Sequence, residues 1–116
     1  MTSELKSLMD SVREFSNERD WDQFHSPKNL ACALSVEAAE LLEHFQWLSE
    51  AQSYALPLDK RNEISEEAAD IFLYLLSLAE KLDFDLIAAS RRKLLLNAEK
   101  YPIDKSRGTS KKYTEL

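Results

Sequence analysis

The sequence has few of the residues from which tight turns are built. It contains one glycine and three prolines in 116 residues, whereas glycine alone averages about 7% of a globular protein. Sandwiches and barrels of β-strands need frequent turns. The shortage therefore argues against an all-β fold and favours one domain of helices joined by few connections.

Cysteine and long apolar runs are also scarce. The one cysteine, Cys32, excludes an intrachain disulfide and a thiolate metal cluster, which suits a reducing compartment. Because Cys32 lies in an apolar segment, we expect it to be a packing residue. No apolar run approaches the roughly 20 residues of a membrane span, and the N-terminus resembles no signal peptide. We expect a cytoplasmic protein with no membrane partner.

The charge balance lacks the basic excess of a nucleic-acid-binding domain. Fifteen lysines and arginines stand against 21 acidic residues, giving a formal net charge of −6. Domains that bind nucleic acid usually carry a basic patch, so a nucleic-acid polymer is not an expected partner. A small anionic substrate remains compatible with this charge if a metal cation offsets the field.

Apolar residues recur at helical spacing in four segments. These segments are residues 3–19, 27–48, 60–82 and 86–100. Four helices with short joins predict an all-α, four-helix bundle. We expect this domain to occupy residues 1–102 and a polar tail to occupy residues 103–116.

The expected helix ends follow from capping and helix-breaking residues. Ser26 and Pro27 are typical of an N-cap and a first helical position. The segment 49–59 is expected to be a loop because Pro57 interrupts it, with Asp59 capping the next helix. Asp83 or Asp85 is expected to cap the last helix, which ends at Tyr101-Pro102.

Two central helices carry carboxylates on their apolar sides. Glu37 falls inside the apolar stripe of the second helix and Glu40 lies at its edge; Glu67 and Asp70 repeat this arrangement on the third. Each pair has i, i+3 spacing, which places both members on one helix face. Packing the two faces together would gather all four carboxylates, which would repel each other unless a cation lies among them. A hard divalent ion such as Mg²⁺ suits oxygen ligands.

Acidic pairs of this kind also occur in proteins that have no catalytic site. A single E-x-x-E is a weak signal, because most helical glutamates are solvated. The Glu-x-x-His motif of di-iron bundles is missing, as are the ligands of a zinc site. A non-catalytic helical interaction module with a structural metal, or a plain bundle with no site, would also contain such residues.

The sequence resembles the all-α nucleoside triphosphate pyrophosphohydrolases, the MazG-like superfamily. The two acidic pairs match its signature. Further segments resemble its dCTP pyrophosphatase branch: "ERDWDQFHSPKNLACAL", "FQW", "EEAADIFLYLLSLA", "KYP" and "KKYTEL". The resemblance covers residues 15–116.

This resemblance implies a Mg²⁺-dependent enzyme that cleaves a nucleoside triphosphate between its α and β phosphates. The expected substrate is dCTP or a modified dCTP, and the alternative is a broader set of canonical or damaged triphosphates. The family further implies a homo-oligomer, a tetramer or a dimer, that associates through helix faces. Glu37 or Glu40 is expected to help deprotonate the attacking water.

The resemblance also implies a set of substrate-binding residues. They match aromatic positions of the nucleoside pocket and polar positions near the phosphates and sugar: Trp21, His25, Trp47, Tyr74, Lys93 and Asn97. The sequence differs from the dCTP pyrophosphatase branch at two places, one that bears on base preference and one that lies beside Glu40. The first helix has no histidine, whereas some members that cleave dCTP place one near Val12. His44 stands where an apolar residue is expected.

Overall fold

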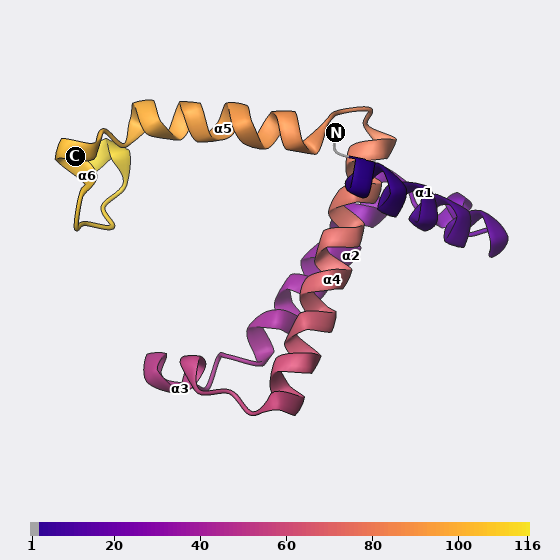
Figure 1. Cartoon of the computed structure of the whole chain (residues 1–116), viewed down its shortest axis with the longest axis horizontal. Coiled ribbons are helices and arrows are strands. Elements are labelled where there is room, and N and C mark those ends of the chain that lie inside the picture. The colour runs from indigo at the N-terminus through magenta and orange to yellow at the C-terminus, as the bar shows by residue number, and fades with distance from the viewer. Residues whose placement is uncertain (1–2) are drawn as a thin grey trace. The chain divides into compact units, whose positions relative to one another are not determined.

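The structure is a computed structural model that describes residues 3–116, and this part of the chain is helical, with no strand (Figure 1). The all-α prediction is confirmed. The elements are α1 (Ser3–Glu18), the 3₁₀ turn η1 (Asp22–Phe24), α2 (Pro27–Glu43), α3 (Glu50–Tyr54), α4 (Leu58–Lys81), α5 (Leu86–Lys100), α6 (Ile103–Ser106) and the 3₁₀ turn η2 (Tyr113–Glu115).

The chain forms two compact units, residues 3–83 and residues 84–116. The first unit holds α1 to α4 and the second holds α5, α6 and η2. Since α5 belongs to the second unit, the four-helix bundle stays a prediction, as does the domain boundary at residue 102.

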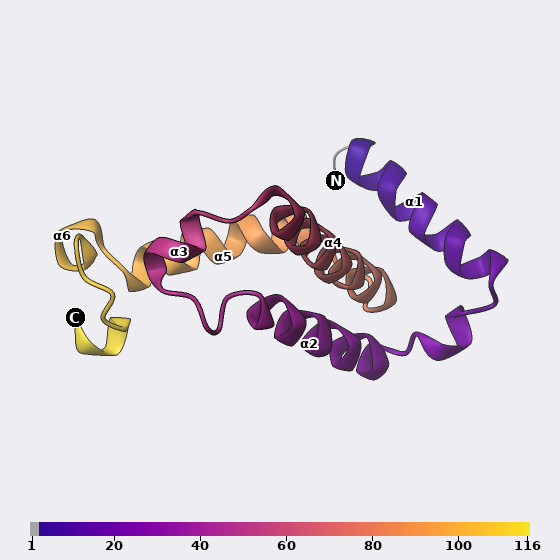
Figure 2. The same cartoon turned by 90° about the horizontal axis from the view of Figure 1, so that it is seen from below.

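Helices α2 and α4 are the main packing pair of the first unit and run antiparallel to each other (Figure 1). Ser26 begins α2 as predicted, because its hydroxyl accepts a hydrogen bond from the Asn29 amide (3.1 Å) and Pro27 occupies the first helical position. Helix α1 contacts α4 less extensively. In Figure 2, α1 and α2 lie on either side of α4.

The fully buried apolar core is small. Within residues 3–116 it consists of Met9 on α1, Leu30 on α2, and Leu76 and Ala79 on α4. All four belong to the first unit, where α1 and α2 contact α4. Large apolar side chains remain exposed elsewhere, among them Tyr54 at 92% and Trp47 at 87%.

The second unit is the helix α5 with the tail folded against its C-terminal end. Asp85 caps α5, accepting a hydrogen bond from the Ala88 amide at 3.0 Å, and the helix ends before Tyr101 as predicted. The ring of Tyr113 packs edge-on against Tyr101, with a centroid separation of 6.0 Å, and the Lys100 ammonium lies 4.9 Å from the Tyr113 ring centroid. These contacts order the tail.

Three local predictions were wrong. Helix α2 ends at Glu43, not near residue 48. The segment after it contains α3, because Ser49 and Gln52 form a reciprocal capping box that starts a separate helix. Asp59 lies in the first turn of α4, and Pro57 occupies the N-cap position.

Cys32 was predicted to pack inside, but it is exposed on α2. No helix in residues 3–116 is long and apolar enough to cross a membrane.

Candidate functional site

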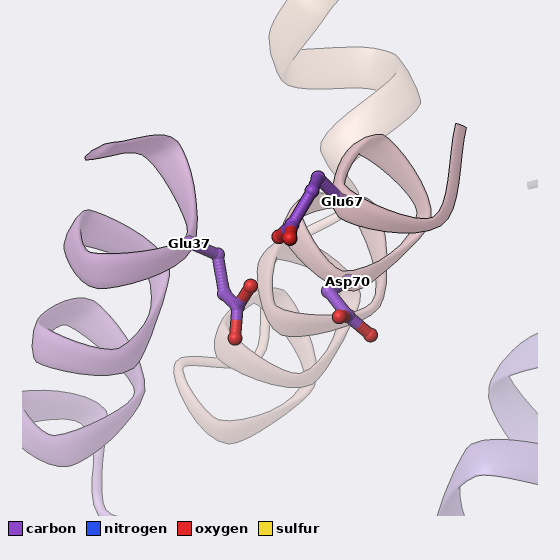
Figure 3. A group of neighbouring side chains, drawn as sticks. All are labelled: Glu37, Glu67 and Asp70. Carbon is purple, nitrogen blue, oxygen red and sulfur yellow. The ribbon is translucent and has the colours of Figure 1, made fainter. Parts of the chain in front are cut away.

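Three of the four predicted acids meet between α2 and α4. Glu37 extends from α2 toward α4, where Glu67 faces it and Asp70 lies one turn further along (Figure 3). One carboxylate oxygen from each residue lies within 4.8 Å of the other two. Glu37 and Glu67 are half-buried, whereas Asp70 is exposed. We call these three residues the acidic triad.

The acidic triad contains buried oxygens that lack a partner. Within residues 3–116, Oε2 of Glu37 and Oε2 of Glu67 are shielded from solvent and have no hydrogen-bond partner. Two ionised carboxylates about 4 Å apart repel by roughly 4 kcal/mol near a protein surface. The pKa of Glu37 is raised to about 7: the largest cause is a hydrogen bond shared with the Glu67 carboxyl, followed by burial and by the carboxyls of Glu40 and Asp70.

The acidic triad fits a divalent cation. Oxygen ligands on opposite sides of a Mg²⁺ ion lie about 4 Å apart, so the 4.8 Å limit requires only small side-chain rotations. A cation would also satisfy the two unpartnered oxygens and offset the negative charge of the neighbouring carboxylates. The donor set consists of carboxylate oxygens, which Mg²⁺ prefers.

Glu40 is the predicted ligand that lies outside the acidic triad. It is half-buried, one turn after Glu37 on α2, and close enough to contribute to the raised pKa of Glu37. The next turn brings His44, whose Nδ1 lies 3.9 Å from Glu63 Oε2 on α4. His44 therefore borders the acidic face and pairs with an exposed glutamate.

A pocket of about 300 Å³ lies next to the acidic triad. It is lined by three elements of the first unit, namely α1, the connection 19–26 and α4: Val12, Phe15, Ser16, Trp21, His25, Asp70, Leu73, Tyr74 and Ser77. Such a volume is at the lower end of the range for small-molecule sites. Asp70 belongs to both the pocket and the acidic triad.

Aromatic rings form one wall of this pocket. Trp21 contacts Phe15 edge-on at 5.6 Å between ring centroids, and it contacts His25 at 6.5 Å. On α4, burial raises the pKa of Tyr74, with further contributions from the charges of Glu37 and Asp70. The lining of the pocket thus combines aromatic rings with one carboxylate, that of Asp70.

The structure brings together three of the six predicted substrate-binding residues. Trp21, His25 and Tyr74 line the pocket. Trp47 follows the end of α2 and is 87% exposed. Lys93 and Asn97 lie one turn apart on α5, in the second unit, with Lys93 exposed and Asn97 half-buried.

Sequence reasoning missed part of the pocket lining. Val12 and Phe15 were recognisable as apolar residues of the first helix, but Ser16, Leu73 and Ser77 carry no signal of their own. Their place follows from the way in which α1 approaches α4, and local spacing does not determine that approach.

Comparisons with known proteins agree with the family resemblance of the sequence. Residues 32–116 match the MazG-like family. The dCTP pyrophosphatase 1 of Mus musculus is 44% identical over 105 residues, which cover 89% of this chain and 62% of that protein. The dCTP pyrophosphatase 1 of Homo sapiens is 41% identical over the same coverage. The chain thus spans about three fifths of the length of these relatives.

A solved structure shares the fold. A pyrophosphatase from Archaeoglobus fulgidus DSM 4304, known from its crystal structure, superposes with a TM-score of 0.83 at 40% sequence identity. The match covers 88% of this chain and 95% of that one.

Proposed function

This chain belongs to the MazG-like family, and we propose that it is a nucleoside triphosphate pyrophosphohydrolase. It would cleave a deoxynucleoside triphosphate between the α and β phosphates, releasing the monophosphate and pyrophosphate. The relatives named dCTP pyrophosphatase 1 support dCTP, or a modified dCTP, as the substrate. Such an activity would clear or balance the nucleotide pool.

The observation that carries this proposal is the position of Asp70. Its carboxylate belongs to the acidic triad and also lines the aromatic pocket. A nucleoside triphosphate has the same two parts, a flat base and a polyanionic chain, joined by a sugar. A base stacked in the pocket would extend its phosphates toward the acidic triad.

In this proposal the acids hold the cation and accept a proton. Glu37, Glu67 and Asp70 would hold the cation, since they form the acidic triad. When bound, Mg²⁺ supplies charge neutralisation for the phosphates and orients the attacking water. Glu37 and Glu40 are the candidates for accepting the proton from that water. Glu40 lies outside the triad and is therefore the one less engaged by the cation.

The pocket residues would bind the nucleoside. Trp21 and Tyr74 offer ring faces and edges for stacking, and His25 offers a ring nitrogen near them. The family resemblance supports a role for Lys93 and Asn97 in contacting phosphate and sugar. A broader substrate set, including damaged triphosphates, is the alternative, because Val12 offers no hydrogen bond to a base.

We further propose that the chain works in the cytoplasm as a homo-oligomer, a tetramer or a dimer. Exposed apolar residues support association: they occur in the first unit at Trp47 and Tyr54, and on α5 at Leu94 (70%) and Leu95 (71%). The proposal keeps the predicted four-helix bundle domain of residues 1–102, which would associate with further copies through its helix faces. A second copy is also the natural route by which Trp47 would reach a nucleoside.

The experiment measures pyrophosphate and monophosphate release from a panel of nucleoside triphosphates, with Mg²⁺ and with EDTA. We expect dCTP to be turned over only with Mg²⁺, and we expect Glu37→Gln to lower kcat by 10²-fold or more. Glu43→Gln is the matched control, because Glu43 lies on the same helix and is exposed. A wild-type protein inactive on every triphosphate, or a fully active Glu37→Gln, would contradict the proposal.

A further inference from the structure

One wall of the pocket is not fixed by extensive packing. Val12, Phe15 and Ser16 on α1, with Trp21 and His25 in the connection that follows, face the residues of α4 across the pocket. Met9 is the buried residue of α1, and Phe15 is 46% exposed. The width of the pocket therefore depends on what else holds α1 and its connection against α4.

Two ion pairs join this wall to the last turn of α4. Glu80 Oε1 accepts a hydrogen bond from Arg13 Nε on α1 at 2.6 Å, and Arg13 is also held by Asp10 at 3.0 Å. The next residue, Lys81, donates a hydrogen bond to Asp22 in the connection. We call Arg13–Glu80 and Asp22–Lys81 the α4 ion pairs.

The α4 ion pairs lie beside the pocket. Their four residues line a small cavity of about 40 Å³. Residues of the aromatic pocket line this cavity too: Val12, Ser16, His25 and Ser77. Consequently, a change in either ion pair would be transmitted to side chains that line the pocket.

The connection is held in shape by hydrogen bonds within it and to the first turn of α2. Asp20 adopts a left-handed backbone conformation (φ 53°). The side-chain amide of Gln23 donates hydrogen bonds to the carbonyl of Asp20 (3.0 Å) and to the carboxylate of Asp20 (3.1 Å). The side-chain amide of Asn29 donates a hydrogen bond to the Phe24 carbonyl at 2.9 Å. Asp22 lies between these bonds, and so the Asp22–Lys81 pair sets the position of Trp21 beside it.

We propose that Glu80 and Lys81 are positioning residues for the substrate pocket. Glu80 acts through Arg13 and Lys81 acts through Asp22, and together they fix the wall that carries Trp21 and His25. This inference rests on the proposed function, because it assumes that the pocket binds the nucleoside. The side chains of the α4 ion pairs are between 31% and 65% exposed, and exposed pairs are weak and screened by salt. The α4 ion pairs therefore hold the wall against α4 only weakly.

The kinetic test reverses one charge and then both. Lys81→Asp is expected to raise the KM for dCTP about three- to fivefold with little change in kcat, since one weak pair becomes a repulsion. The double variant Asp22→Lys/Lys81→Asp restores an opposite-charge pair and should bring the KM back toward the wild-type value. The matched control is Lys60→Asp, which breaks the exposed Lys60–Glu63 pair (3.2 Å) elsewhere on α4 and should leave KM unchanged.

A second readout does not depend on turnover. In a Trp47→Phe background Trp21 is the remaining tryptophan, and iodide quenching reports its exposure. Lys81→Asp should increase the quenching and the double variant should restore it. Because salt screens exposed ion pairs, 1 M NaCl should increase the quenching in the parent protein and in the double variant.

The two readouts separate failure of this inference from failure of the proposed function. If Lys81→Asp changes neither KM nor quenching, or if the double variant does not restore them, the positioning role is wrong. If no triphosphate is cleaved but quenching follows the charges, the α4 ion pairs do position Trp21 and the proposed function fails instead. Lys81→Met, which removes the charge without reversing it, should give a smaller change in the same direction.

Discussion

Helix α4 meets α2 along one side and α1 along another, and its charges are arranged differently on the two sides. Toward α2, Glu67 faces Glu37, and both have a buried oxygen without a partner in the described part of the chain. Toward α1 and the connection, Glu80 and Lys81 are each paired with an opposite charge. The side with the most extensive packing thus carries the like charges, and the side with little packing carries the paired ones.

The two arrangements of charge have different effects on the fold. Paired charges on an exposed surface hold elements together weakly. Like charges placed against each other destabilise the fold unless something binds between them. The α2 side is therefore the one shaped for a ligand, and the α1 side is the one shaped to hold a wall in place.

The strongest test of the α2 side removes the carboxylate shared by the acidic triad and the pocket. Asp70→Asn should lower kcat by 10²-fold or more, because the neutral amide replaces one anionic ligand of the cation. Pyrophosphate release with saturating Mg²⁺ measures this effect. Glu66→Gln, an exposed neighbour on α4, is the control, and equal activity of the two variants would mean that Asp70 has no part in the reaction.

A smaller effect is expected on metal-free stability. Glu37 has a pKa of about 7 in the folded chain, against an ordinary value of 4.5. Between these values the folded state binds more protons than the unfolded state, so in EDTA the free energy of unfolding should fall as pH rises from about 4.5 to 7. Glu37→Gln should remove this decline and be more stable at pH 8, by on the order of 1 kcal/mol.

Urea denaturation at a series of pH values, with a fixed protein concentration, measures this difference. Glu43→Gln should follow the wild-type curve, because Glu43 is an exposed acid on the same helix. If the free energies of unfolding of Glu37→Gln and wild type change with pH in parallel, the charge of Glu37 does not destabilise the metal-free fold.

Much of the fold was predictable because its signals are local. The Ser26-Pro27 cap, the Asp85 cap and the end of α5 at Tyr101-Pro102 each depend on neighbouring residues. The capping box of Ser49 and Gln52 was equally local, and recognising it would have separated α3 from α2. Helical periodicity placed Glu37, Glu67 and Asp70 correctly on facing sides of two helices.

The parts that sequence reasoning missed depend on distant residues. Arg13 and Glu80 are 67 positions apart, and Asp22 and Lys81 are 59 apart. No spacing rule pairs them, and each alone resembles a solvated surface charge. The role of Glu40 as a cation ligand stays a prediction, since spacing places a residue on a helix face but does not fix the direction of its carboxylate.

The opposed glutamates also bear on how fast the chain folds. Residues 44–57 alone join α2 to α4, so their contact closes a short loop and is expected to form early. Forming it brings Glu37 against Glu67, which above neutral pH adds repulsion to the barrier. In EDTA at pH 8, Glu37→Gln should therefore refold about two- to threefold faster than wild type, whereas equal refolding rates would place this contact after the transition state. The rate of folding would then depend on the cation that the acidic triad is proposed to hold.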